Sequence, residues 1–140
     1  MKQLKIKKLT SDAKLPTRAY STDCGLDIYS NETSIVEPGE GKVFSTGVAG
    51  EFEPGYLGML TDRSSMAKKG FKLAGGVIDP HFCGELSVVL RNLTRQPMLV
   101  SKGDRIAQLL IIPISIPEVV EVDELTSNGR GINSFGSSGA

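Results

Sequence analysis

Short runs of alternating apolar and polar residues dominate this chain, a pattern typical of β-strands that bury one face. Leu4 and Ile6 share a face near the start of the chain, and Leu26 and Ile28 share a face further along. Other runs of this kind are KVFSTGVAG, YLGMLTD, ELSVVLRN, MLV and RIAQLLIIPIS, separated by the turn-forming stretches EPGEG, EPGY and SKGD. The spacing predicts an all-β fold, either a sandwich, a barrel or a jelly roll.

Two stretches depart from this strand pattern. SSMAKKG predicts one short helix, with Ser64 as its amino-terminal cap and Gly70 at its end. AQLLIIPISI is apolar at nearly every position. Because a strand of an antiparallel sheet usually has one polar face, a strand that is apolar on both faces needs a second buried surface. We therefore expect this strand to lie at a contact between subunits.

The composition narrows the class of protein. A chain of 140 residues predicts one domain that can bury its own core, and its formal net charge of zero gives no indication of a nucleic-acid or acidic-membrane partner. The start, MKQLKIKKL, lacks the apolar run of a signal peptide, and no stretch is long enough to span a membrane. We expect a soluble intracellular protein, cytoplasmic or nuclear, that binds neither nucleic acid nor membrane.

Thiol and imidazole groups are few. Cys24, Cys83 and His81 do not have the spacing of a zinc site, and a reducing compartment predicts that both thiols are free. A lone histidine also weakens any Ser-His-Asp or Cys-His scheme. Oxidation sensing by the two thiols is a further hypothesis.

The stretch GGVIDPHFCGE, residues 75–85, contains residue types that suit a ligand site. Its paired glycines allow the main chain to approach a ligand closely, and Asp79 comes where a short strand ends. With Phe82 three residues later, the hairpin could hold a flat base and its sugar, with a general base for water beside them. The alternative is an ordinary hairpin whose aspartate serves the turn.

Two further stretches suit a polyanion. Arg63, Ser64 and Ser65 stand where the helix would begin, and free N–H groups together with a two-pronged guanidinium suit phosphate. The alternative is a helix cap beside a surface arginine. Gln108 is polar within an apolar strand, so it needs a partner if it is buried. That partner is either a backbone group or a ligand.

The chain closes with RGINSFGSSG, which is rich in glycine and serine yet carries Arg130 and Phe135. Such a segment cannot bury enough apolar surface to fold alone. One hypothesis is that it orders over a ligand, with the ring on a base and the arginine at the far end of a phosphate chain. The other is an end with no function. We predict a β domain over residues 1–126 and a flexible arm over residues 127–140 that closes over an active site.

Taken together, these stretches resemble the motifs of the homotrimeric dUTP diphosphatases, or dUTPases. CGLDIYS, DRSSMA, GGVIDPHFCGE, GDRIAQL and RGINSFGSSG occur in the family's order, and the likeness runs from about residue 21 to Gly139. The resemblance implies a distorted jelly-roll-like β-barrel subunit and a threefold trimer in which every chain contributes to each active site. It also implies hydrolysis of dUTP to dUMP and pyrophosphate, which keeps uracil out of DNA and supplies dUMP for dTMP synthesis.

The resemblance assigns roles to individual residues. Asp79 would orient and deprotonate the water that attacks the α-phosphorus, and Ser64 would ease the departure of pyrophosphate. Mg²⁺ would be held by the triphosphate and by waters, with no direct protein ligand and with Asp27 in the outer shell. The other substrate-binding residues would be Arg63 and Gln108 at the phosphates, Arg130 at the γ-phosphate, Phe135 on uracil, Phe82 under the sugar, and Ser65, Leu73, Gly76, Val77, Ile78, Gly136 and Ser137. Hairpin backbone from residue 73 to residue 77 would read uracil.

Several residues differ from the family's usual pattern. Phe82 replaces a tyrosine, His81 replaces an acidic residue, Asp62 stands where proline or glycine is common, and Ser134 replaces a frequent glycine. Because Phe82 keeps the ring, we expect discrimination against the ribose sugar to survive.

Two other functions stay open at this point. A dCTP deaminase shares DRSS and IDPHF, but it uses a glutamate where this chain has Val89, which cannot transfer protons, and it is a longer chain. A regulator that orders its tail on dUTP and binds a protein partner would have the same fold. Replacing Asp79 with asparagine separates the second case from the enzyme, because binding should persist while hydrolysis collapses.

Overall fold

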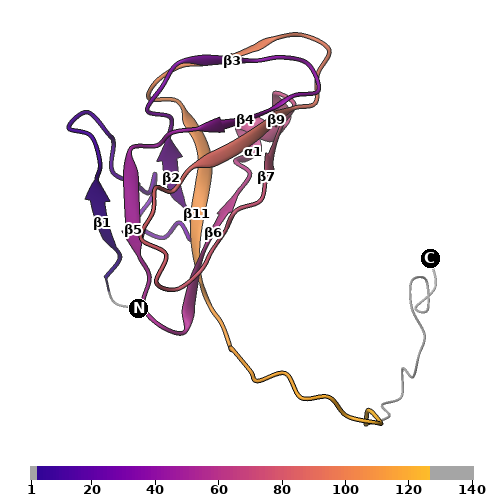
Figure 1. Ribbon diagram of the computed structural model, residues 1–140. Helices are drawn as coiled ribbons and strands as arrows, with labels where there is room; N and C mark the ends of the chain where they lie inside the picture. The colour runs from indigo at the N-terminus through magenta and orange to yellow at the C-terminus, as the bar shows by residue number, and fades with distance from the viewer. Residues whose placement is uncertain (1–2, 127–140) are drawn as a thin grey trace.

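A computed structural model describes residues 3–126 of the 140-residue chain. Figure 1 shows strands packed into one body with a single short helix at its side. The elements are β1 (Lys5–Lys8), β2 (Leu26–Tyr29), β3 (Ser34–Val36), β4 (Gly41–Phe44), β5 (Val48–Glu51), β6 (Tyr56–Thr61), α1 (Ser64–Lys68), β7 (Phe71–Ala74), β8 (Val77–Ile78), β9 (Val88–Asn92), β10 (Met98–Val100) and β11 (Arg105–Pro113). The predicted all-β class with one short helix is confirmed. No helix in the described part is long and apolar enough to cross a membrane.

The strands form antiparallel sheets in which many neighbours are far apart in sequence. The largest sheet has the order β2-β11-β6-β8, and a second has the order β4-β9-β7. Two smaller pairs, β1 with β5 and β3 with β10, complete the body. Long crossover connections between strands of two packed sheets are the arrangement of a jelly roll.

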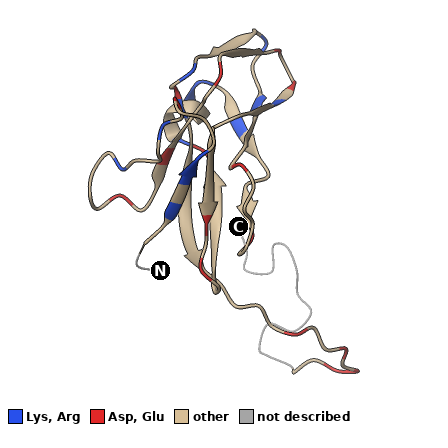
Figure 2. Cartoon of the chain, turned by 60° about the vertical axis from the view of Figure 1, so that its left-hand side comes forward, with Lys and Arg blue, Asp and Glu red and all other residues tan. Residues whose placement is uncertain are grey.

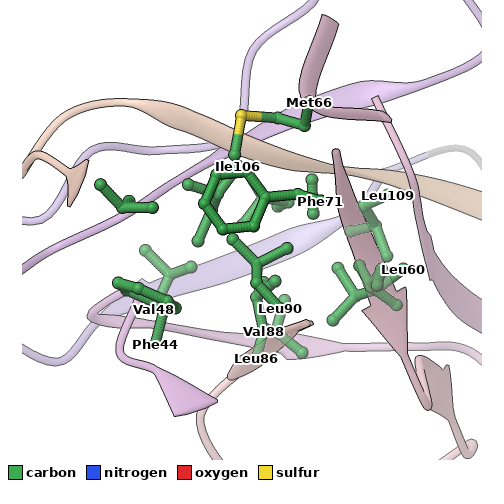
Figure 3. Close-up of a cluster of buried hydrophobic side chains, with 14 of the residues drawn as sticks. Phe44, Val48, Leu60, Met66, Phe71, Leu86, Val88, Leu90, Ile106 and Leu109 are labelled. Atoms are coloured by element: carbon green, nitrogen blue, oxygen red, sulfur yellow. The ribbon is translucent and has the colours of Figure 1, made fainter. Parts of the chain in front are cut away.

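The core lies where the two larger sheets face each other. Figure 3 shows the ring of Phe71 among side chains from both sheets, with Met66 of α1 lying over it. Leu26 and Ile28 are buried, as their alternation predicts, and β9 buries every second residue. The period-two pattern therefore identifies the inward face correctly.

Helix α1 begins differently from the prediction. Its N-cap is Arg63, whose backbone is extended (φ −86°, ψ 136°), and no side chain caps the helix. Ser64 is instead the first helical residue, so the predicted Ser64 cap is wrong. The cause is the position of Arg63, whose carbonyl accepts the first helical bonds while Asp27 holds its side chain. Gly70, at φ +96°, ends the helix as predicted.

Strand β11 carries apolar side chains on both of its faces. Leu109 is fully buried, whereas Leu110 and Ile112 are half-buried on the opposite face beside Met59 and Leu57 of β6. A single chain therefore leaves part of this apolar face open. The subunit contact expected here stays a prediction.

The residues after β11 leave the body. The amide of Ile114 donates to the carbonyl of Gly55 at 2.9 Å, and residues 115–126 then extend away (Figure 1). Figure 2 shows acidic residues, coloured red, along this segment. The large apolar side chains that it exposes are Ile116, Val119, Val120, Val122 and Leu125. The predicted arm at residues 127–140 lies outside the described residues.

Candidate active site

A polar cleft of about 280 Å³ gathers residues from three of the stretches singled out in the sequence. We call it the arginine cleft. Strand β2 and the loop before it form one wall, the junction of β6 with α1 forms another, and β11 supplies the third. Its lining is Ala19, Asp23, Cys24, Gly25, Asp27, Arg63, Ser64 and Gln108. The fold thus brings the first, second and fourth predicted motifs together.

The guanidinium of Arg63 is fixed on its inner side. Its Nε donates to Oδ1 of Asp27 at 2.6 Å, and its Nη1 donates to the hydroxyl of Ser65 at 2.9 Å. The other carboxylate oxygen of Asp27 accepts from Nη1 of Arg105 at 3.1 Å. One carboxylate thus serves two arginines, which orients a cationic group before any ligand arrives.

Gln108 finds a backbone partner. Its Nε2 donates to the carbonyl of Asp62 at 2.7 Å, while its register in β11 places it opposite Asp27 of β2. A Cβ on Gly25 would meet Oε1 of Gln108 at 2.6 Å, so the glycine leaves room for this amide. The structure therefore answers how a polar side chain is satisfied within an apolar strand.

Residues 75–76 join β7 to β8 where a hairpin was predicted, but β7 pairs with β9 and β8 pairs with β6, so the two strands belong to different sheets. The segment from β7 to β8, called the hairpin below, is therefore a sharp reversal of the chain and not a paired β-hairpin. Gly75 and Gly76 both have positive φ, at +75° and +116°, as the turn requires. The carbonyl of Gly76 accepts from the amide of Leu60 at 2.7 Å, which docks the hairpin on β6. A second pocket, of about 170 Å³, opens between β6 and the hairpin, and we call it the hairpin pocket. Its lining is Met59, Leu60, Thr61, Asp62, Lys72, Leu73, Gly75, Gly76 and Val77.

Asp79 follows β8 and is exposed, as is Phe82. The amide of Phe82 donates to the carbonyl of Asp79 at 3.2 Å, which closes a turn. His81 lies within this turn at φ +68°, in the left-handed region that non-glycine residues seldom adopt. The turn thus presents a carboxylate and a ring on one short loop.

Strand register separates Asp79 from the arginine cleft within one chain. Gly58 of β6 pairs with Ile78 of β8, so Asp79 lies opposite the amino-terminal half of β6. Arg63 follows the other end of β6, about five residues beyond Gly58. At about 3.4 Å per residue, an extended chain spans roughly 17 Å from Gly58 to Arg63, and Asp79 lies one residue further from Arg63 than the Gly58–Ile78 pair. One chain therefore does not bring Asp79 and the cleft residues into a single site.

Glu85 anchors the loop that carries Asp79, although sequence reasoning gave it no role. Its Oε1 accepts from the hydroxyl of Ser45 at 2.6 Å and from the amides of Thr46 and Gly47 at 2.9 and 2.6 Å. Burial acts to raise the pKa of Glu85, but these three hydrogen bonds hold that pKa below its usual range. The carboxylate stays charged and ties the loop to the β4–β5 turn.

The structure places the remaining predicted residues as follows. Leu73, Gly76 and Val77 line the hairpin pocket, and Ile78 follows them in β8. Both cysteines are free and exposed, and Cys24 lines the arginine cleft. Arg130, Phe135, Gly136 and Ser137 lie outside the described residues.

The donor set of the cleft suits a metal ion that arrives with a ligand. Within residues 3–126, no group of three or more His, Cys, Asp or Glu side chains is placed to hold an ion. Both oxygens of Asp27 already accept from arginines. Mg²⁺ commonly binds through one or two carboxylates together with substrate phosphates and waters. The cleft fits that mode with Asp27 in the outer shell, and direct ligation by Asp27 would require displacing an arginine.

The fold and the cleft define an all-β domain with an arginine-lined polar site. A family model described as dUTPase matches residues 11–139, and the chain belongs to this family. A curated relative, the deoxyuridine 5'-triphosphate nucleotidohydrolase of Tropheryma whipplei (strain Twist), is 43% identical over 128 residues, covering 89% of this chain and 88% of its own.

Solved structures of phage dUTPases share the whole fold. Staphylococcus bacteriophage 80alpha dUTPase with dUPNHPP superposes with a TM-score of 0.91 at 34% identity, covering 100% of both chains. That phage enzyme is described among phage dUTPases that control the transfer of virulence genes by a G protein-like mechanism. A mutant dUTPase of phage phi11 of S. aureus, described as coordinating a structural Mg(II) ion, has a TM-score of 0.84 at 31% identity, covering 89% of this chain and 99% of its own. The jelly-roll-like fold expected from the resemblance is confirmed.

Proposed function

We propose that this chain hydrolyses dUTP to dUMP and pyrophosphate inside the cell, which lowers the supply of uracil for DNA and provides dUMP for dTMP synthesis. The observation that carries the proposal is the arginine cleft of a dUTPase-family chain, in which Arg63, Ser64 and Gln108 meet from two separate segments. A deaminase is disfavoured because Val89 in β9 offers no proton-transfer group.

The arginine cleft is suited to the triphosphate. Within residues 3–126, Asp27 accepts from Nε of Arg63, and Ser65 and the carbonyl of Arg105 accept from its Nη1, which leaves the Nη2 group of Arg63 for a phosphate oxygen. A fixed cation requires little reorganisation when negative charge builds up during phosphoryl transfer. The Ser64 hydroxyl, which lines the same cleft, would donate near the oxygen that bridges the α- and β-phosphates.

Asp79 would act on the attacking water. It lies on an exposed turn, where its carboxylate can accept a proton from water placed in line with the α-phosphorus. Bound Mg²⁺ would neutralise phosphate charge, with Asp27 orienting its water shell. The carboxylate positions the nucleophile, and the arginines stabilise the departing pyrophosphate.

The hairpin would bind the base and the sugar. Leu73, Gly75, Gly76 and Val77 line a pocket of about 170 Å³, where main-chain groups of residues 73–77 would read the base, and Gly76 allows the chain to turn closely against β6. The ring of Phe82 would pack under the deoxyribose and exclude a 2′-hydroxyl by contact. Arg130 at the γ-phosphate, with Phe135, Gly136 and Ser137 over uracil, would complete the site from residues 127–140.

A trimer would assemble complete sites. Because Asp79 and the arginine cleft are separate within one chain, Asp79 of one subunit would face Ser64 of another. The half-buried apolar face of β11 and the exposed apolar residues of segment 115–126 are surfaces that such an assembly would bury.

Subunit complementation tests this arrangement. Asp79→Asn and Ser64→Ala chains should each be nearly inactive alone, because each lacks one half of every site. Refolded together, they should regain part of the wild-type activity, since some sites then combine an intact Asp79 with an intact Ser64. A mixture as inactive as either parent would place both residues in the same chain's site and contradict the proposal.

A regulatory role is the second candidate, favoured by the description of the phage 80alpha relative. In that case nucleotide binding, not turnover, would carry the signal. The Asp79→Asn chain, with dUTP affinity and hydrolysis measured side by side, separates the two. Retained binding with lost hydrolysis assigns Asp79 to catalysis, whereas normal hydrolysis removes it from that role.

A further inference from the structure

Asp62 joins the arginine cleft to the hairpin pocket, although neither the motifs nor the mechanism above uses its side chain. Oδ1 of Asp62 accepts from the amide of Leu73 at 2.6 Å, and Oδ2 pairs with Nζ of Lys72. Its backbone carbonyl accepts from Nε2 of Gln108 at 2.7 Å. A single residue therefore contacts both the cleft and the strand that leads into the hairpin.

The contacts of Asp62 with Leu73 and Gln108, called the Asp62 bridge, lie where the backbone hydrogen bonds between β6 and the hairpin end. Strand β6 pairs with β8 at Gly58 and Met59, and the amide of Leu60 then donates to Gly76. Strand β7 belongs to the other sheet, where it pairs with β9. Beyond Leu60, the carboxylate of Asp62 supplies the link from β6 to β7, across the mouth of the hairpin pocket.

We propose, resting on the proposed function, that Asp62 is a positioning residue for base selectivity, which sets the width of the hairpin pocket by holding Leu73 against the end of β6. The pocket would then admit uracil and exclude the extra methyl group of thymine. With an aspartate at this position, the placement of the hairpin depends on the hydrogen bond between the side chain of Asp62 and the Leu73 amide.

The hydrogen bond from the Leu73 amide to Asp62 should hold the hairpin in place more than the ion pair of Asp62 with Lys72 does. The side chain of Lys72 is 58% exposed and that of Asp62 is 23% exposed, and exposed ion pairs contribute little to stability. Burial acts to raise the pKa of Asp62, but Lys72 and the Leu73 amide hold that pKa below its usual range. The carboxylate is therefore charged at neutral pH, and the amide of Leu73 donates to an anion.

The test compares four variants of the full-length protein. Asp62→Ala removes both contacts, Asp62→Asn keeps an oxygen that can accept from Leu73, and Lys72→Met removes only the ion pair. Asp12→Asn is the matched control, because it breaks a similar pair with Lys102 away from both pockets. We would measure kcat and KM for dUTP and dTTP, the unfolding temperature, and hydrogen exchange at the Leu73 amide.

We expect Asp62→Ala to raise the KM for dUTP by about tenfold, to change kcat by less than about twofold, and to narrow the preference for dUTP over dTTP. Asp62→Asn should show a smaller effect, and Asp12→Asn should match the wild type. Lys72→Met changes a residue that lines the pocket, so its readout is hydrogen exchange at the Leu73 amide, which should stay at the wild-type rate. Hydrogen exchange at the Leu73 amide should be fastest in Asp62→Ala and slower in Asp62→Asn.

Two results would overturn the proposal. One is an unchanged preference for dUTP in Asp62→Ala with unchanged exchange at Leu73. The other is an equal fall in activity towards both nucleotides that follows the unfolding temperature, which indicates a structural role alone. If Asp62→Ala does not fold, hydrogen exchange at the Leu73 amide is compared in Asp62→Asn and Lys72→Met. Faster exchange in Asp62→Asn would support the proposal, and equal exchange in the two variants would overturn it. A wild-type protein inactive on dUTP would instead refute the proposed function, and exchange at Leu73 would still report on the bridge.

Discussion

Nε of Arg63 lies 2.6 Å from Oδ1 of Asp27, and the two side chains are only 19% and 13% exposed. Because both groups are largely withdrawn from water, this ion pair is screened less than a surface pair. It also fixes the direction in which the rest of the guanidinium faces. The geometry of the arginine cleft thus depends on Asp27, a polar residue of the alternating strand β2.

Asp27→Asn should therefore impair substrate turnover. The amide is neutral, so Arg63 loses its charged anchor, and we expect kcat/KM for dUTP to fall about tenfold or more. Asp23→Asn is the control, because Asp23 lines the same cleft but accepts from the amide of Tyr20. Steady-state kinetics with equal losses in both variants would contradict a specific role for the Asp27 anchor.

Gly76→Ala should damage the hairpin. Gly76 has a φ of +116°, and a Cβ there would overlap the carbonyl oxygen of Leu60. We expect a lower unfolding temperature and weaker binding of a non-hydrolysable dUTP analogue, measured by calorimetry. Gly55→Ala is the control for backbone strain, since Gly55 has a φ of +84° with no atom within 4 Å of the added Cβ. Similar binding losses in the two variants would argue against the close packing of Gly76 on Leu60.

His81→Asn should stabilise the protein. His81 is held at φ +68°, a conformation that asparagine adopts more readily. The expected gain is on the order of 0.5 kcal/mol in the free energy of unfolding, measured by urea denaturation. A loss of stability would show that the imidazole makes a compensating contact.

Glu85→Gln should change how stability depends on pH. A carboxyl group whose pKa is lower in the folded than in the unfolded state adds stability above its unfolded pKa, and this contribution is lost as pH falls through the folded pKa. Hydrogen bonds from Ser45, Thr46 and Gly47 lower the pKa of Glu85 in the folded state. The variant should thus be less stable than the wild type at pH 7, with the gap closing below about pH 4.3.

Thermal unfolding across pH 3 to pH 7 tests this prediction. Glu51→Gln is the control, because the pair of Glu51 with Lys5 is exposed and the substitution should change stability little. A gap between Glu85→Gln and the wild type that stays constant with pH would show that the lost charge is not the cause.

Phe82 should preserve sugar selectivity. Its ring lies beside Gly84, where an added Cβ would meet the ring at 2.5 Å, so a side chain at position 84 would displace the ring. We expect hydrolysis of UTP to be much slower than hydrolysis of dUTP, and Phe82→Ala to reduce that difference. Equal turnover of UTP and dUTP by the wild-type protein would contradict this role.

Features of the fold that depend on residues close together in sequence could be predicted from the sequence. The alternation in β2 and β9 identified buried faces, and the paired glycines identified the chain reversal between β7 and β8, although not the different sheets to which these strands belong. The Ser64 cap was wrong because Arg63 takes the N-cap position, and the side chain of Arg63 is held by Asp27, which is 36 residues away.

The contacts of Asp62 and Glu85 could not be predicted in the same way. Glu85 contacts Ser45 across 40 positions of sequence, and this contact depends on the pairing of β4 with β9 and on the bridge between Ala49 of β5 and Glu85. Asp62 uses the Leu73 amide, which is available only because β6 and β7 belong to different sheets. Such partners are set by register, which a single sequence does not reveal.

The register of β6 against β8 bears on inheritance. In the proposed trimer, a chain that is damaged in both the arginine cleft and the Asp79 turn would inactivate two catalytic centres, because each half would belong to a different centre. Intact subunits of the same trimer would then lose the centres that they share with the damaged chain. A gene copy encoding such a chain, expressed with a sound copy, should lower the cell's total dUTP hydrolysis by more than its share of the protein.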